Sequence, residues 1–490
     1  MSSLHHIPCI SGLRRLLKSL SVLFVVLIFA ACSFDHSYTL PKVVVETDRW
    51  KNQPWQPAQP SDQIPRGKWW MLFQDETLDT LEEKLTQGNA SLAVALSKYE
   101  QAGFYLKQLG AAESPSVDTT TSLTSNKQSD DRPLRSKTQP NYYAANTVGV
   151  GVSYELDVWG RVKNSVAAGK ATMQATQADV ENVRLSLQVL LADLYIRIRN
   201  TDNQFSLLTR TVQEYEKTLA LIQRRHDGGI ASGLDVARAD SQLSLAKAEL
   251  SDLHIQRDVY EHAIAVLLGQ SPSSFSLPTD NRIAMQFPQI PVGVPSNLLQ
   301  RRPDIAAAER RAAAANARIG LAEAAFFPSF SLGAQAGFQN TGGADLLNSP
   351  NSFWSIGPSV SLNIFDGQLR KAQAAQAKAF LDQAAQEYKA VVLNAFQQVE
   401  DDLSRMRYYK EQMVDRENVA KANQKALNLA LNRYKQGAVS YLEVTIAQTN
   451  ALQSDRMLVT LQSQMLLSSL GLVRALGGGW EKNSFTLEKA

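Results

Sequence analysis

The sequence of 490 residues is poor in cysteine, histidine and net charge. It has two cysteines and six histidines, and its 50 Lys and Arg residues nearly balance its 47 Asp and Glu residues, for a formal net charge of +3. A protein that binds nucleic acid needs an excess of basic residues, so we expect no nucleic-acid partner. His226, His254 and His262 are scattered along expected helices, where a solvated histidine is more common than a metal ligand. We therefore expect no metal site.

Motifs of the common catalytic sites are also absent. The sequence has no GxSxG nucleophile elbow, no phosphate-binding P-loop and no Cys/His pair. Gly477-Gly478-Gly479 resembles a phosphate loop only in composition, and it follows an expected helix, where capping of the helix C-terminus explains it. We predict that the protein is not an enzyme and uses no cofactor.

Long apolar runs are missing after the first thirty residues. A basic segment with Arg14 and Arg15, an apolar segment at 20–29 and the small pair Ala30-Ala31 together have the form of a signal peptide, residues 1–31. No later segment approaches about 18 consecutive apolar residues, the length that indicates a transmembrane helix. We therefore expect no transmembrane helix in the mature chain.

Cys32 is the first residue after this signal. It lies where a bacterial lipobox places its acylated cysteine, although Phe29 stands where such signals usually have Leu. Ordinary cleavage that leaves Cys32 unmodified is the alternative. Once the signal and Cys9 are removed, Cys32 would be the only cysteine, which suits an oxidising compartment without disulfides. Ser33 rather than Asp follows it, as in lipoproteins sorted to the outer membrane, so we predict a lipid-anchored segment at 32–74.

One stretch of the sequence recurs. Residues 225–236, RHDGGIASGLDV, correspond to residues 433–444, RYKQGAVSYLEV, 208 positions later (437 − 229). In both stretches an Arg closes a helical pattern, a Gly breaks it, and Leu-(Asp/Glu)-Val begins a second helical run. The chain is therefore two copies of one unit.

Each copy contains a very long helical pattern before its Gly break. From Arg161 to Arg225, and again from Leu369 to Arg433, the apolar residues step mostly by three and four without a proline. At about 1.5 Å per residue such a helix is about 100 Å long, whereas core helices average about 11 to 12 residues. We predict coiled-coil packing of the long helices 161–227 and 368–435 and of the helices that follow them, 232–269 and 440–476.

Alternating patterns about 70 residues before each Gly break predict β-strands. Apolar or aromatic residues alternate with small or polar residues at 148–158, 330–338 and 354–364, and more weakly at 117–123. Such strands have the length of tilted transmembrane β-strands, about 9 to 11 residues, and their small and polar positions suit a water-filled lumen. A soluble antiparallel sheet with one wet face would alternate equally well. We favour the transmembrane interpretation, with strand pairs within 115–158 and 328–364.

Four strands per chain are too few to close a pore. An open sheet in lipid leaves unpaired edges, at several kcal/mol for each backbone group. Single-chain bacterial barrels have at least about eight strands. Several subunits must therefore share one barrel, and periodicity leaves two, three or four copies open.

A set of motifs occurs along the chain in a specific order. They are Trp69-Trp70-x-x-Phe73-x-Asp75-x-x-Leu78, YELDVWGR at 154–161, Arg302-Pro303-Asp304-Ile305, Phe327-Pro328, Ile364-Phe365-Asp366-Gly367, the two Gly breaks, and Leu476-Gly477-Gly478-Gly479-Trp480. With these motifs the sequence resembles the TolC-type outer-membrane factors, and within them the lipoprotein branch that serves resistance-nodulation-division efflux pumps. The resemblance covers nearly all of the mature chain.

The resemblance implies an α+β membrane protein in which the duplicated unit forms a homotrimer. A twelve-stranded transmembrane β-barrel in the outer membrane would continue into a long periplasmic α-helical barrel. The implied function is the outer-membrane channel of a tripartite efflux system, a passive exit duct for small molecules. Its partners would be a periplasmic adaptor (membrane fusion) protein, an inner-membrane pump and outer-membrane lipid. A type I secretion duct for polypeptides and a structural envelope-tethering lipoprotein are the alternatives.

The two Gly breaks are the expected contact sites for the adaptor. If the strands mark the outer membrane, the breaks lie at the far ends of the long helices, deep in the periplasm, where the resemblance implies adaptor docking and the closed end of the channel. The residues carried over are Arg225, Gly229, Leu234 and Asp235 in the first tip and Arg433, Gly437, Leu442 and Glu443 in the second. Alternatively, each Gly only terminates a helix and each acid only stabilises the N-terminus of the next helix.

A gate near the tips is a further expectation from the resemblance. Family channels are closed by acidic and basic residues there, and the candidates in this chain are Asp235, Arg238 and Asp240. Asp235 and Arg238 can face each other at i,i+3. The second copy reads Ile446-Ala447-Gln448 where related sequences often carry an acid, so a simple ring of acids does not fit this chain.

These expectations divide the chain into six parts. They are the signal peptide 1–31, the N-terminal segment 32–74, the first repeat 75–270, a Pro-rich joint 271–295, the second repeat 296–477 and the C-terminal tail 478–490.

Overall fold

A computed structural model describes residues 38–39, 68–129, 131, 138–279, 288, 302–342 and 345–478. The predicted signal peptide, Cys32, most of the predicted 32–74 segment, nearly all of 280–295 and the tail after Gly478 lie outside the described residues. Within the described ranges, no helix is both long and apolar enough to cross a membrane.

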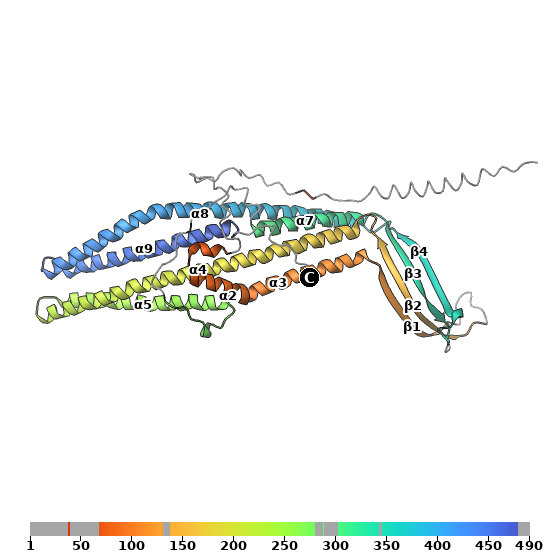
Figure 1. Ribbon diagram of the computed structural model, residues 1–490, viewed down its shortest axis with the longest axis horizontal. Helices are drawn as coiled ribbons and strands as arrows, with labels where there is room; N and C mark the ends of the chain where they lie inside the picture. The colour runs from red at the N-terminus through yellow and green to blue at the C-terminus, as the bar shows by residue number, and fades with distance from the viewer. Residues whose placement is uncertain are drawn as a thin grey trace, which may run out of the picture. The chain divides into compact units, whose positions relative to one another are not determined.

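The strands form one antiparallel sheet in the order β1-β2-β3-β4 (Figure 1). Their bounds are Ser116–Lys127, Tyr142–Leu156, Ser329–Asn340 and Ser352–Ser361. The register places Val150 opposite Ala336 and Ala336 opposite Trp354, so the apolar positions share one face of the sheet. Gly149, Gly337 and the serines near them lie on the other face, because successive strand residues point to opposite sides.

The strand ends differ from the sequence prediction at β4. We expected β4 to continue to Ile364, but the ladder ends where Ser361 pairs with Ser329. The residue before Ser329 is Pro328, which has no N–H to donate to a further rung. Ile364 is therefore outside the sheet, and its side chain is 90% exposed.

Helices make up most of the rest of the described chain. Their bounds are α2 Glu76–Gly88, α3 Ala90–Gly110, α4 Arg161–Asp227, α5 Gly233–Leu267, α7 Pro303–Ala324, α8 Leu369–Lys435 and α9 Tyr441–Ala475. Short 3-10 turns lie at Trp69–Phe73, Ala111–Glu113, Pro272–Ser274 and Ser349–Asn351. Helices α4 and α8 each have 67 residues, and α5 and α9 each have 35. Equal lengths at equivalent positions show that the duplication extends to the helix ends.

The described residues belong to two compact units. One contains Glu100–Ala175 and Glu309–Glu387, with the sheet and an alanine-rich cluster around Ala312 and Ala315. The other contains Thr176–Ala308 and Tyr388–Ala490 together with the N-terminal helices up to Tyr99, and its largest core gathers Trp69, Phe73 and Leu191. Both units draw on both repeats, so compactness does not follow the duplication.

Each repeat anchors the start of one helix on the end of another. Asn89, which precedes α3, donates its side-chain N–H to the carbonyl of Leu267 at the end of α5, with an N···O distance of 2.8 Å. Arg302, which precedes α7, donates to the carbonyl of Ala475 at the end of α9, at 3.1 Å. The two carbonyls belong to the last residues of the matching helices, so an amide and a guanidinium do the same work in the two copies.

Candidate functional site at the helix tips

Both long helices end at a glycine with a left-handed backbone. Gly229 has a φ of 72° and Gly437 a φ of 77°. The N–H of Gly229 donates to the carbonyl of His226 at 2.8 Å, and the N–H of Gly437 donates to the carbonyl of Tyr434 at 2.9 Å. Longer bonds back to the carbonyls of Arg225 and Arg433 complete the same C-terminal cap in both copies. Glycine adopts this φ without the strain that a β-carbon would cause.

The two tips differ where the next helix begins. Ser232 accepts a hydrogen bond from the N–H of Asp235 at 3.2 Å, and its own N–H donates to the Asp235 carboxylate at 3.4 Å, which makes a capping box at α5. Ser440 has the corresponding place before α9, but its side chain makes no cap bond. The tip of α5 is therefore closed by side chains, while the tip of α9 is not.

Arg225 joins the two tips. Its guanidinium donates to the carbonyl of Tyr434 at 3.0 Å and lies 4.9 Å from the centre of the Tyr434 ring. The Tyr434 ring packs on Tyr441 with 5.5 Å between ring centres. Ile222 and Val444 complete a buried cluster beneath these contacts. The end of α4 is thus held on the turn between α8 and α9.

Burial keeps both tyrosines neutral. It raises the pKa of Tyr441 to about 12. It also raises the pKa of Tyr434, where the nearby Arg225 acts against the rise and the Asp235 carboxylate adds to it. The tip cluster therefore has no tyrosine that ionises near neutral pH.

A family model for this chain matches both repeats. The family is described as "Outer membrane efflux protein", and the matches cover residues 81–270 and 294–478. The chain belongs to this family. The matched stretches cover more than half of the chain and leave out only the N-terminal residues, the segment between the two matches and the C-terminal tail.

Individual relatives agree with the family. The chain is 30% identical over 466 residues to the probable efflux pump outer membrane protein TtgC of Pseudomonas putida KT2440, covering 94% of this chain and 95% of the relative. Its fold is similar to a membrane protein from Pseudomonas aeruginosa, with a TM-score of 0.83, 28% identity and coverage of 92% and 98% of the two chains. It is also similar to the outer membrane protein VceC of Vibrio cholerae, with a TM-score of 0.78, 28% identity and coverage of 84% and 99%.

These likenesses confirm the family, the fold class and the general function that the sequence predicted. The protein is an outer-membrane efflux protein, with strands of a membrane barrel and long periplasmic helices, and it acts in the outer membrane as the channel component of an efflux system. The family and its structural neighbours are channel proteins rather than enzymes. Among the described residues, no group of three or more His, Cys, Asp or Glu side chains could hold a metal ion.

The predicted docking residues of this efflux protein lie at the ends of its two helical hairpins. Leu234 is 59% exposed and Leu442 is 44% exposed, and Arg433 and Glu443 are also exposed. Arg225 is half-buried because it reaches the other tip. Their role in docking stays a prediction.

The predicted gate residues are not paired with one another. The carboxylate of Asp235 takes part in the capping box, and no ion pair joins it to Arg238 within the described part of the chain. Asp240 is exposed on the next turn. A gate made of these three side chains stays a prediction, and Asp235 already has a structural partner.

The sequence prediction missed the two tyrosines that join the tips. Tyr434 follows Arg433 directly, and Tyr441 stands where the first copy has Gly233. An aromatic residue on each side of a helix break was an available signal, because apolar side chains that flank a turn often pack together.

Proposed function

We propose that three copies of the chain close one twelve-stranded barrel and form a passive duct through which small molecules leave the cell. The observation that carries this proposal is the sheet, in which β1 and β4 are open edges and one face is apolar. In lipid, unpaired edge groups cost several kcal/mol each, so β4 of one subunit must pair with β1 of the next. Four strands from each of three subunits would make the barrel.

Disulfide cross-linking of the strand edges tests this arrangement. A cysteine series along β1, from Thr119→Cys to Leu123→Cys, would be combined with Ile356→Cys on β4, in a chain with Cys32 replaced by Ser. Oxidation should give covalent dimers and trimers on denaturing gels for the positions that face each other. The matched control is Val150→Cys with Ala336→Cys, opposite residues on β2 and β3, whose disulfide must leave a monomer. Monomers throughout the β1 series would contradict the shared barrel.

We infer that the two tips dock the hairpin of a periplasmic adaptor that connects the channel to an inner-membrane pump. The exposed Leu234 and Leu442 support this inference, because apolar residues at a surface are suited to helix packing. Leu234→Asp with Leu442→Asp should abolish efflux while the channel still inserts in the membrane. Leu347→Asp, at a 68% exposed residue in the loop before β4, is the matched control and should leave efflux intact. Normal efflux in the double variant would refute tip docking.

Passive conduction has its own test. The purified protein should conduct ions in a planar bilayer, and deletion of the gene should sensitise cells to exported compounds. TtgC, a relative named as an efflux pump component, supports small-molecule cargo. A protein that inserts but never conducts, with or without an adaptor, would contradict the duct.

We also propose that Cys32 carries a lipid anchor. Its place after a signal peptide, with Ser33 following, supports this proposal. Mass spectrometry of the mature N-terminus should find acyl chains on wild-type protein and none on the Cys32→Ser variant. An unmodified Cys32 in protein extracted from outer membranes would rule the anchor out.

A further inference from the structure

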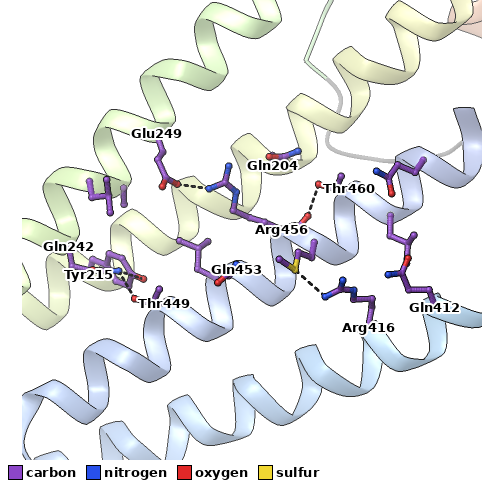
Figure 2. Close-up of a pocket in the computed structure, with 16 residues that line it drawn as sticks. Gln204, Tyr215, Gln242, Glu249, Gln412, Arg416, Thr449, Gln453, Arg456 and Thr460 are labelled. Carbon is purple, nitrogen blue, oxygen red and sulfur yellow. Dashed lines mark hydrogen bonds and ion pairs between the residues drawn. The ribbon is translucent and has the colours of Figure 1, made fainter. Parts of the chain in front are cut away.

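A cavity lies between the two helical hairpins, away from the tips. Its volume is about 570 Å³, within the range of about 300–1,000 Å³ that is usual for small-molecule sites. One stripe of α9, from Thr449 to Gln464, forms its long wall, and α4, α5 and α8 supply the remaining walls (Figure 2). At about 1.5 Å per residue the stripe is about 22 Å long.

The polar lining of this cavity contains one guanidinium without an acidic partner. Arg456 reaches from α9 to Glu249 on α5, with an N···O distance of 2.7 Å, so these two charges neutralise each other. Arg416 on α8 donates to the sulfur of Met457 at 3.1 Å, as Figure 2 shows. A thioether is a weak acceptor, and most N–H donors of Arg416 remain available.

The sequence around Arg416 explains why it is left without an acid. Positions three and four residues away, where a helical partner would lie, are Gln412, Met413, Val419 and Ala420. Asp415 and Glu417 are adjacent in sequence and therefore point to other sides of the helix. Neither belongs to the cavity lining, in which Glu249 is the only acid. The lining thus has a surplus of one positive charge.

We propose that this cavity binds an amphipathic organic anion. The carboxylate or sulfonate of the anion would accept two hydrogen bonds from Arg416, a geometry that the guanidinium fork favours. The apolar body would lie on Leu245, Leu452 and Leu461, with glutamines such as Gln412 and Gln453 at the margins. The site is a place on the channel wall where a solute can be held, and it goes beyond passive conduction.

Binding of 2-naphthalenesulfonate to the purified full-length protein in lipid nanodiscs tests the proposal. We expect saturable binding by saturation-transfer NMR, and a loss of affinity of about tenfold in Arg416→Gln, which removes a charge-assisted bond. Arg407→Gln is the matched control on the same helix, because Arg407 already pairs with Glu411. It should bind the anion as the wild type does.

A second variant separates the cavity from the charge alone. Gln453→Trp keeps the net charge and fills the cavity from an exposed position, and it should also weaken binding. The neutral analogue 2-naphthalenemethanol should bind at least about tenfold more weakly than the sulfonate. Equal binding by Arg416→Gln, equal binding of the neutral analogue, or no binding to the assembled protein would each overturn the proposal. Conductance of the same variants would report on the duct independently.

Discussion

The first hairpin, α4 with α5, and the second, α8 with α9, have the same helix lengths but different internal supports. In the first, the buried Asp202 accepts from both Arg199 and Arg257, which also donate to the carbonyls of Pro278 and Leu277. In the second, the position equivalent to Asp202 is Lys410, which is exposed. A duplicated backbone can therefore keep its geometry while the side chains that support it diverge.

The two tips repeat this contrast on a smaller scale. The glycine caps after α4 and α8 are the same, because only a left-handed residue can end the helix in that way. The following N-caps differ, since Ser232 forms a capping box and Ser440 does not. Constraints from the backbone were thus kept in both copies, whereas side-chain contacts were free to change.

Removal of the Asp202 carboxylate should have the largest effect. Asp202→Ala leaves two buried guanidinium groups without their shared partner, and we expect a loss of about 3 to 5 kcal/mol of stability. Lys410→Ala, at the equivalent exposed position, should change stability by less than about 0.5 kcal/mol. Thermal unfolding followed by circular dichroism measures both. Similar melting temperatures for the two variants would remove the contrast between the hairpins.

Glu82 should make the stability of the N-terminal core depend on pH. Its carboxyl is fully buried without a hydrogen-bond partner among the described residues, and burial raises its pKa well above the usual value. The stability that this protonated acid allows is complete below its unfolded pKa, about 4.3, and is lost as the pH rises toward the folded pKa. Glu82→Gln should therefore melt higher than the wild type, by a margin that grows from pH 5 to pH 8.

Asp402 in the second repeat provides the comparison for Glu82. Burial raises its pKa too, but Arg405 lies 2.8 Å away and acts against the rise. Asp402→Asn should therefore not reproduce the growing margin. A margin for Glu82→Gln that stays constant with pH would show that Glu82 is ionised in the folded protein.

Loss of the link between the tips should have a moderate effect. Arg225→Ala removes a hydrogen bond and a cation–π contact to Tyr434, together about 1 to 2 kcal/mol. Spin labels at the exposed Ile230 and Ala438 should then show a broader distance distribution. Arg433→Ala, an exposed residue in the equivalent place, should leave the distribution unchanged.

The smallest effect is expected at the N-caps. Ser232→Ala should cost about 1 kcal/mol because the capping box is lost, while Ser440→Ala should cost close to nothing. Hydrogen exchange of the first turns of α5 and α9 measures the two locally. Equal increases in exchange would show that the caps are alike in solution.

Much of the fold could be predicted because it depends on local patterns. Apolar spacing of three and four indicated the long helices, and alternation indicated the strands of the sheet. The end of β4 could not be read from alternation, since it depends on Pro328 of another strand. For the tips, the glycine breaks were evident, but their partners were not.

The sequence by itself determined the duplication, the helix and strand periods and the glycine breaks, because each of these depends on residues close together along the chain. Only the tertiary structure decided that Arg225 contacts Tyr434, that Asp202 joins two arginines, and that Arg416 is left without an acid. These contacts depend on how helices far apart in the sequence pack against one another. A local pattern has no information about that packing.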